Sequence, residues 1–156
     1  MSEKLLLAID LGLRTGLAYF AAEGSEKGTL RRFGSKHFGS RTTLRRGAAG
    51  MLRAAGTIAH LVMEGDAQIA HLWAQVATSY GATWEIVSPD RWRRELLGLS
   101  DLDSRSWKAR ADHAAREVIA HSRLRVPNQI RHDAAEAILI GAWWCQVHSS
   151  LRREGH

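Results

Sequence analysis

Cysteine, proline and long apolar runs are all scarce in this sequence, and each scarcity excludes a class of protein. The 156 residues include one cysteine, Cys145, so no disulfide can form within the chain. The segment MSEKLLLAIDL has no long apolar stretch followed by a small-residue cleavage site, and we therefore expect a cytoplasmic protein. The longest apolar candidate, AILIGAWWC, is half of the roughly 18 residues that a membrane span needs, which argues against a membrane protein.

Linkers, internal repeats and low-complexity segments are also absent from the sequence, which has only two prolines. A chain of 156 residues is long enough to enclose a hydrophobic core without disulfides, metals or a partner chain. We therefore expect one domain that spans residues 1–156.

Acidic residues are fewer than basic residues in this sequence. Lysine and arginine number 22, and aspartate and glutamate 16, which gives a formal net charge of +6. The arginines concentrate in LRRFGSKHFGSRTTLRR, RWRREL and LRREGH. Such a basic surface favours a polyanionic partner, for example nucleic acid. Charge alone leaves this open, because many basic proteins bind no nucleic acid.

Apolar runs separated by turn residues predict an α/β domain. Residues 4–10 form a continuous apolar run typical of a strand buried on both faces, and strands at 16–22 and 29–38 follow after short turns. Ser40 or Thr42 can cap the next helix. The remaining segments predict strands at 58–64 and 83–89 and helices at 67–81, 89–98, 104–122 and 131–153. The order βββαβαβααα predicts a mixed five-stranded sheet, three antiparallel strands followed by parallel strands, flanked by helices.

Four acidic residues occupy positions from which they can meet. Asp10 ends the first predicted strand and Glu64 the fourth, while Asp133 and Glu136 lie one helical turn apart near the start of the last helix. Residues three apart on a helix share a face, so this pair can point at the sheet edge where the two strands end, if those strands are neighbours. Asp66 is a rival to Glu64, and the helical pair has the alternative of being ordinary first-turn acids.

Clustered carboxylates repel one another and persist only when protons or cations neutralise them. Oxygen-only ligands select hard ions such as Mg²⁺ or Mn²⁺. Two such ions about 3.5–4 Å apart can clamp a phosphodiester, one activating water and the other stabilising the leaving oxygen. The acidic residues therefore predict a metal-dependent phosphodiester hydrolase.

Four segments together carry a resemblance to a known group of nucleases. They are AIDLGLRTGLAYF, LVMEG, VSPDRWRRELLG and RHDAAEAILIGAW, with Lys108 before the last of them, and the match covers residues 5–144. The sequence resembles the ribonuclease H-like nuclease superfamily and, within it, the RuvC-type Holliday junction resolvases. The resemblance implies a ribonuclease H-like fold, two Mg²⁺ or Mn²⁺ ions per active site, a homodimer, and branched DNA as the substrate, namely a four-way junction cut by paired nicks.

The same resemblance implies roles for individual residues of this chain. The metal-binding carboxylates would be Asp10, Glu64, Asp133 and Glu136. His132 would assist water activation or contact phosphate, and Lys108 would lie near the backbone of the bound DNA. The helix after the second carboxylate would form the dimer face through Ile69, Leu72, Trp73 and Val76. Ile69 lies near the position from which a side chain would wedge into the centre of the junction.

The sequence departs from the pattern of these resolvases at three points. Leu11 replaces the usual proline after the first aspartate, and Glu136 stands where aspartate is commoner. The segment between Glu64 and VSP is shorter than in the bacterial housekeeping enzymes. These departures fit a phage-type or otherwise divergent member, and they leave the dimer geometry open.

Basic residues near these motifs are candidates for contact with the DNA backbone. The nucleic-acid-binding candidates are Arg14, Lys108, Arg45, Arg46, Arg91, Arg93 and Arg94. Each has the alternative of being an ordinary solvated surface residue. Trp92 and Trp107 lie among several of these residues, and burial is favoured for both over stacking on bases. Trp143, Trp144 and Cys145 are expected in the core or at an interface.

Three other functions fit parts of the sequence. D-x-G-x-x-x-G after a strand also resembles the phosphate-binding hairpin of actin-like and sugar-kinase ATPases, but those enzymes clasp nucleotide between two such domains. The YqgF-like monomeric nucleases, which process ribosomal RNA precursors, share the first aspartate and the late D-A-A pattern. A module that binds junctions without cutting is the third alternative, and the retained acidic cluster argues against it. We therefore predict a metal-dependent endonuclease that resolves branched DNA.

Overall fold

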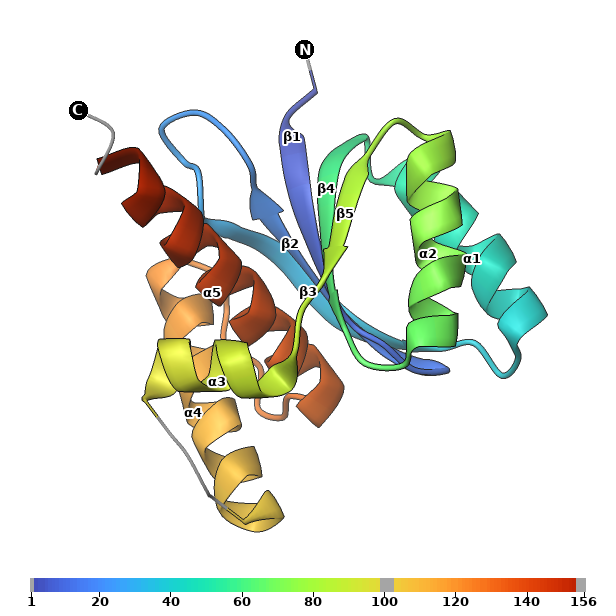
Figure 1. The fold of residues 1–156 in the computed structure, drawn as a ribbon. Helices are drawn as coiled ribbons and strands as arrows, with labels where there is room; N and C mark the ends of the chain where they lie inside the picture. Colours follow the sequence, from blue (N-terminus) through green and yellow to red (C-terminus); the bar gives the residue numbers. More distant parts are fainter. Residues whose placement is uncertain (1, 99–102, 154–156) are drawn as a thin grey trace.

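Five strands and five helices make up the part of the chain that the computed structural model describes, residues 2–98 and 103–153 (Figure 1). The strands form one sheet, with α1 and α2 on one face and α3, α4 and α5 on the other. The elements are β1 Lys4–Asp10, β2 Arg14–Ala21, β3 Leu30–His37, α1 Arg41–Ala54, β4 Thr57–Glu64, α2 Ala67–Ser79, β5 Thr83–Ile86, α3 Pro89–Leu97, α4 Ser104–His121 and α5 His132–Arg153.

The strand order across the sheet is β3-β2-β1-β4-β5, with β1 in the centre. β1 is antiparallel to β2 and parallel to β4, β2 is antiparallel to β3, and β4 is parallel to β5. β1 can take the central place because the apolar run from Leu6 to Ile9 is fully buried and suits a strand covered on both faces. The predicted mixed five-stranded sheet, with three antiparallel strands followed by parallel ones, is confirmed.

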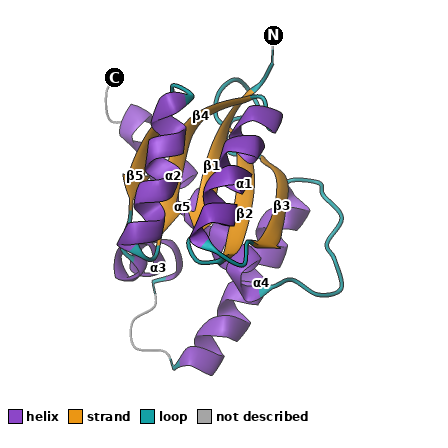
Figure 2. Ribbon diagram, turned by 90° about the vertical axis from the view of Figure 1, so that its right-hand side faces the viewer, coloured by secondary structure: helices purple, strands orange, loops and turns teal. Residues whose placement is uncertain are grey.

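Side chains alternate between the two faces of the sheet, and each face has its own apolar core. Leu7 and Ile9 of β1 belong to the core shared with α1 and α2. Leu6 and Ala8 belong to the core shared with α4 and α5. Figure 2 shows α1 and α2 in front of the sheet and α5 behind it. Asp10 lies two residues after Ala8, so its side chain is on the α5 face of the sheet.

Local side-chain caps fix where the first two helices begin. Ser40, rather than Thr42, caps α1, because the Ser40 Oγ accepts a hydrogen bond from the backbone N–H of Thr43. Asp66 caps α2, and its carboxylate accepts from two backbone N–H groups in the first turn of that helix. Asp66, the rival acid, is therefore engaged as a cap, and Glu64 is the acid that ends β4.

The strand β5 is shorter than the predicted strand at 83–89. Just after β5 ends, the Val87 N–H donates a hydrogen bond to the Met63 carbonyl of β4 at 2.8 Å, which ends the pairing of this segment with β4. Ser88 then caps α3, and Pro89 is the first residue of that helix. Proline has a fixed φ suited to the first turn of a helix and no N–H for a strand ladder, so the chain turns into α3 here.

The helix α2 turns its apolar residues inward, against the sheet and α1. Ile69, Trp73 and Val76 are 8%, 0% and 7% exposed, and all three lie in the core on that face. Leu72 is half-buried and packs against the same core. The prediction that these residues form a dimer face is therefore wrong, whereas the prediction that Ile69 lies near the position of a junction wedge stays a prediction. Their apolar spacing reflects the packing of α2 on its own domain.

Exposed apolar side chains lie instead where α2 ends and along β5. Tyr80, the C-cap of α2, and Trp84 and Ile86 of β5 are 48%, 40% and 46% exposed. Trp84 and Ile86 are two residues apart on a strand, so they share one face. No other described strand pairs with the outer side of β5. We call Tyr80, Trp84 and Ile86 the β5 edge surface.

The helix α5 runs along the opposite layer and contributes much of its core. Trp143 and Cys145 are buried, as predicted, and Trp144 is half-buried with its ring stacked on those of His60 and His148. Trp92 and Trp107, expected to be buried, are buried in the same layer. Among the described residues no helix combines the length and apolar character that would let it span a membrane.

Candidate active site

Asp10 and Glu64 end neighbouring parallel strands. In the β1–β4 ladder Asp10 lies opposite Glu64, and the Leu11 N–H continues the pairing with a 2.8 Å bond to the Glu64 carbonyl. The expectation that the first and fourth strands are neighbours is therefore confirmed. Ala8 and Val62, two residues earlier on each strand, belong to the core on the α5 face. Alternation places both carboxylates on that same face.

The N-terminal part of α5 brings a third carboxylate to this point. Gly16 of β2, which lies opposite Asp10 in the sheet, sits against the backbone of Asp133, where any side chain on Gly16 would collide with α5. The missing side chain lets α5 approach the sheet closely, and Glu136, one turn into the helix, is only 4% exposed. One ligand oxygen from each of Asp10, Glu64 and Glu136 lies within 4.8 Å of the other two.

Asp133 lies beside this group but outside it. Its Oδ2 accepts a 2.7 Å hydrogen bond from the Ser35 hydroxyl of β3, and its Oδ1 accepts from the backbone N–H of Ala134 at 2.8 Å. The sequence predicts four converging carboxylates, and three of them form the compact group. The fourth is held by Ser35, a residue that sequence reasoning missed. The assignment of Asp133 as a metal ligand stays a prediction.

Three side chains converge on a single oxygen of Glu136, two by hydrogen bonds and one by an ion-pair contact. Arg93 Nη2 of α3 lies 2.8 Å from Oε1, Trp107 Nε1 of α4 lies 2.7 Å from it, and His132 Nε2 lies 3.1 Å from it. The contact with His132 follows from the i, i+4 spacing of the two residues on α5. The contacts with Arg93 and Trp107 depend on how α3 and α4 pack against α5, and no pattern in the sequence indicates them.

Burial and mutual repulsion change the acidity of the carboxylates. Burial, followed by the charges of Glu136, Glu64 and Asp133, raises the pKa of Asp10 from 3.8 to about 8, although the Arg93 guanidinium lowers it. Burial and the charge of Glu136 also raise the pKa of Glu64, while Arg93 and a hydrogen bond with Asp10 lower it. Asp10 therefore holds a proton at neutral pH when no cation is bound.

The chemistry of this group fits a hard divalent cation. All the candidate ligand atoms are carboxylate oxygens, which Mg²⁺ and Mn²⁺ prefer. Their negative charges outnumber the single positive charge of Arg93 that pairs with Glu136, so protons or further cations are needed to balance them. Asp10, Glu64 and Glu136 can therefore hold such an ion in place of the proton on Asp10.

The chain is similar to known proteins in its structure rather than in its sequence. No family model matches the chain, and none of the curated proteins matches it. The RuvC protein of Thermus thermophilus is 14% identical, with a TM-score of 0.67 over 94% of this chain and 96% of that one. The yeast mitochondrial Holliday junction resolvase Ydc2 is 11% identical, with a TM-score of 0.65 over 95% and 82% of the two chains. The fowlpox virus resolvase, solved with Holliday junction DNA, is 11% identical, with a TM-score of 0.60 over 91% and 99%.

This chain has the ribonuclease H-like fold of these resolvases. The fold expected from the sequence resemblance is thereby confirmed. Within the ribonuclease H-like fold of this chain, the acidic group lies where the neighbouring strands β1 and β4 end and α5 begins. The site thus combines two rigid strands of the central sheet with the helix that covers it.

The candidates for DNA contact lie on both layers of the ribonuclease H-like fold. Arg14 is exposed at the start of β2 and, two residues before Gly16, has its side chain on the α5 face with the carboxylates. His37 of β3, also exposed, lies opposite Arg14 in the ladder. Arg45 and Arg46 are exposed on α1, which packs on the other face of the sheet. The fold therefore brings Arg14, but not the two α1 arginines, to the layer of the acidic group.

The basic residues of α3 and α4 differ in their contacts. Arg93 is the one whose guanidinium reaches the acidic group. Arg91 is exposed and pairs with Glu95 at 3.4 Å, and Arg94 is exposed. Lys108 is exposed on α4, immediately after the tryptophan that contacts Glu136. The roles predicted for these residues in DNA binding stay predictions.

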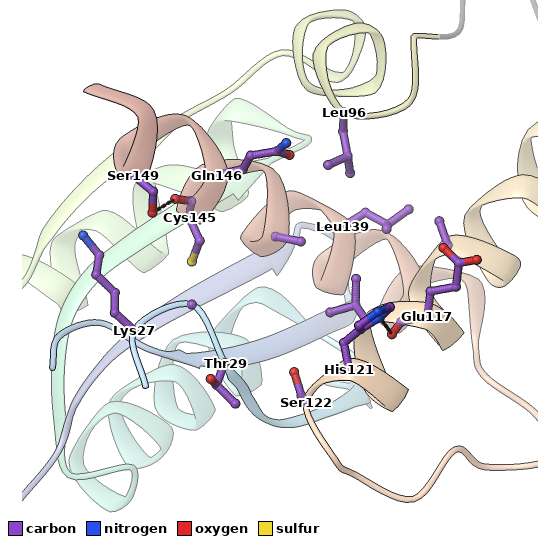
Figure 3. Close-up of a pocket in the computed structure, with 14 residues that line it drawn as sticks. Lys27, Thr29, Leu96, Glu117, His121, Ser122, Leu139, Cys145, Gln146 and Ser149 are labelled. Carbon is purple, nitrogen blue, oxygen red and sulfur yellow. Dashed lines mark hydrogen bonds between the residues drawn. The ribbon is translucent and has the colours of Figure 1, made fainter. Parts of the chain in front are cut away.

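A cavity of about 510 Å³ lies elsewhere in the domain. Figure 3 shows it between the segment 27–29, the end of α4 and the C-terminal half of α5. Cys145 lines this cavity, and burial raises the pKa of its thiol to about 12, which keeps the thiol uncharged and unreactive. Since no carboxylate of the acidic group lines the cavity, it is separate from the candidate active site.

Proposed function

We propose that the protein is a metal-dependent endonuclease that hydrolyses phosphodiester bonds in branched DNA and resolves four-way junctions by paired nicks. The observation that carries this proposal is the group of Asp10, Glu64 and Glu136, whose ligand oxygens lie within 4.8 Å of one another. The net charge of +6 supports a polyanionic substrate. The fold shared with resolvases, one of them solved with Holliday junction DNA, supports the choice of substrate.

Mg²⁺ or Mn²⁺, two ions per site, would be held by Asp10, Glu64 and Glu136, with Asp133 as the fourth member of the predicted set. When bound, such ions would supply Lewis acidity that neutralises the negative charge developing on the phosphoryl oxygens. The chain contributes the placement of the ligands. Asp10 and Glu64 end rigid strands of the sheet, and Glu136 lies on a buried turn of α5. The three carboxylates are therefore held in fixed positions relative to DNA bound on this side of the domain.

The basic side chains around the acidic group bind and orient the DNA backbone. His132, 3.1 Å from the Glu136 carboxylate, contacts the scissile phosphate or accepts a proton from the attacking water. Lys108 of α4 and Arg14 of β2 bind phosphates near the site. Further phosphate contacts come from Arg91, Arg93 and Arg94 of α3 and from Arg45 and Arg46 of α1. The two α1 arginines lie on the other layer and would meet a different arm of the junction.

Paired nicks at a symmetric junction require two active sites, and we include a homodimer in the proposal. The β5 edge surface is the part of the domain that supports it, because three large apolar side chains are exposed there beside an edge of β5 that no other described strand pairs with. This surface replaces the buried residues of α2 that the resemblance to the resolvases implies.

The proposal is tested by offering the protein three labelled substrates: a synthetic four-way junction, a linear duplex of matched sequence, and a single-stranded RNA. Each is incubated with Mg²⁺, Mn²⁺ or EDTA. We expect paired symmetric nicks on the junction with either metal and none with EDTA. Cleavage of the RNA alone would overturn the proposal in favour of a YqgF-like processing nuclease. Tight binding of the junction without any cleavage would overturn it in favour of a non-cutting junction-binding module.

A further inference from the structure

The Glu136 carboxylate is oriented by side chains from three helices. Its Oε1 accepts hydrogen bonds from the Trp107 indole N–H of α4 at 2.7 Å and from the Arg93 guanidinium of α3 at 2.8 Å, and the His132 ring of α5 lies 3.1 Å away as an ion-pair contact. A carboxylate oxygen has two lone pairs, so the two hydrogen bonds use the accepting capacity of Oε1. We therefore assign the other oxygen, Oε2, to a cation.

Trp107 is the most firmly fixed of the three side chains that contact Oε1. Its side chain is 8% exposed, and its ring packs edge-on against Trp92, with ring centroids 5.6 Å apart at 67°. An indole has a single N–H with a fixed direction, whereas a guanidinium can donate from several positions on a long, flexible side chain. The packing of Trp107 therefore determines where its hydrogen bond points.

Trp107 also supports the second donor. The Arg93 guanidinium lies over the Trp107 ring at 4.5 Å from its centroid and over the Trp92 ring at 5.5 Å. One face of the indole thus holds the guanidinium while its N–H holds Glu136. Through these two contacts a single buried side chain positions both the carboxylate and the cation paired with it.

Trp92 shows that burial of an indole in this layer does not require a carboxylate partner. It is fully buried, and its Nε1 has no hydrogen-bond partner among the described residues. The two adjacent tryptophans therefore share the same core but differ in one respect: only Trp107 donates to the acidic group. Trp92 therefore contributes packing alone, whereas Trp107 both packs and contacts Glu136.

We propose that Trp107 is a positioning residue whose indole N–H holds Glu136 Oε1, so that Oε2 faces Asp10 and Glu64 and a divalent cation binds tightly. The inference rests on the metal dependence in the proposed function. Hydrogen bonds to the ligands of a metal fix the direction of the ligand atom, and their loss weakens metal affinity by about 10- to 100-fold in other proteins.

The test is a calorimetric titration of the full chain with Mn²⁺ in the absence of DNA. Trp107→Phe keeps an aromatic ring but removes the N–H, and Trp92→Phe is the matched control, because it makes a similar change in the same core without touching the acidic group. We expect Trp107→Phe to bind Mn²⁺ at least about tenfold more weakly than the wild type. We expect Trp92→Phe to bind it as the wild type does. Equal affinities for wild type and Trp107→Phe, or equal losses in both variants, would overturn the inference.

A second measurement uses the wild type and does not depend on the folding of a variant. Mg²⁺ is titrated into ¹⁵N-labelled protein, and the indole N–H resonances are followed by NMR. We expect the Trp107 indole resonance to shift most among the tryptophans, because its hydrogen bond ends on a ligand of the ion. A stationary Trp107 resonance in a protein that binds Mg²⁺ would overturn the inference.

These measurements separate the two proposals. If the wild type binds Mn²⁺ but cuts no four-way junction, the proposed function fails, and the comparison of Trp107→Phe with Trp92→Phe still decides the role of Trp107. If the wild type binds neither Mn²⁺ nor Mg²⁺, the acidic group is no metal site and both proposals are overturned.

Discussion

Asp10 belongs both to the central strand of the fold and to the proposed metal site. It ends the central strand, where burial and three neighbouring acids raise its pKa to about 8. A carboxyl in such a place is costly to ionise unless a cation faces it. Arg93 supplies part of this compensation through Glu136, and a proton on Asp10 supplies the rest in the absence of metal.

The raised pKa of Asp10 predicts how the stability of the metal-free protein depends on pH. The carboxyl ionises near pH 3.8 in the unfolded chain but only near pH 8 in the folded one, so the folded state holds more protons between these values. The free energy of unfolding therefore falls as pH rises through this interval. With EDTA present, we expect thermal or urea unfolding to show a loss of about 2 to 4 kcal/mol between pH 5 and pH 9.

Asp10→Asn is the control for this pH dependence. The amide has nearly the same shape and no charge, so the variant should lose less stability over the same pH range and should be more stable than the wild type at pH 9. Saturating Mg²⁺ should reduce the loss in the wild type, because the cation takes the place of the proton. An identical pH dependence in both proteins would show that Asp10 ionises normally.

The residues of the site divide into those that the sequence indicates and those that it does not. Asp10 and Glu64 could be predicted because each directly follows an apolar strand, and Glu136 because it lies one turn from Asp133 on a helix. Ser35 and Trp107 contact partners 98 and 29 positions away in the sequence. Their contacts arise from the packing of separate elements, and neither residue belongs to a local pattern.

At the scale of elements, the approach of α5 to β2 places Glu136 in the site. Gly16 makes this approach possible, since a side chain there would meet the Asp133 backbone. The contact joins the second strand to the last helix and depends on a position without a side chain. In the sequence this glycine belongs to the motif D-x-G-x-x-x-G, and nothing there indicates that the last helix packs against it.

Gly16→Ala should therefore displace α5 from the sheet. We expect the variant to lose about 1–3 kcal/mol of unfolding free energy, and to lose metal affinity because Glu136 moves with α5. Gly34→Ala on β3 is the matched control, because its added methyl group meets nothing within 4 Å. Urea unfolding and Mn²⁺ titration measure both effects. A Gly16→Ala protein as stable as Gly34→Ala would mean that α5 does not pack as closely as described.

Predictions for whole elements succeeded where local signals determine them. Ser40, one of the two predicted caps of α1, and Pro89 at the start of α3 mark helix ends in the sequence itself. The resemblance to the resolvases implies a dimer face on α2, and the apolar periodicity of this helix could not test that, because periodicity indicates which side of a helix is apolar but not what covers it. In the structure the sheet and α1 cover that side.

At the scale of the whole molecule, the β5 edge surface is where a second copy would bind under the proposal. Trp84→Ser combined with Ile86→Ser should convert a dimer into a monomer without changing its circular dichroism, because both side chains are 40% or more exposed. Sedimentation or light scattering gives the mass. Leu13→Ser, at an exposed apolar residue outside this surface, is the control and should leave the mass unchanged. A double variant that stays dimeric would place the interface elsewhere.

The most direct test of the central claim is cleavage of a four-way junction, labelled in turn on each strand, by the wild type and by Asp10→Asn with Mg²⁺. We expect symmetric nicks in two opposite strands with the wild type, and binding without nicks with Asp10→Asn. Equal cleavage by the two proteins, or cleavage by the wild type that persists in EDTA, would contradict the assignment of the acidic group as the catalytic metal site.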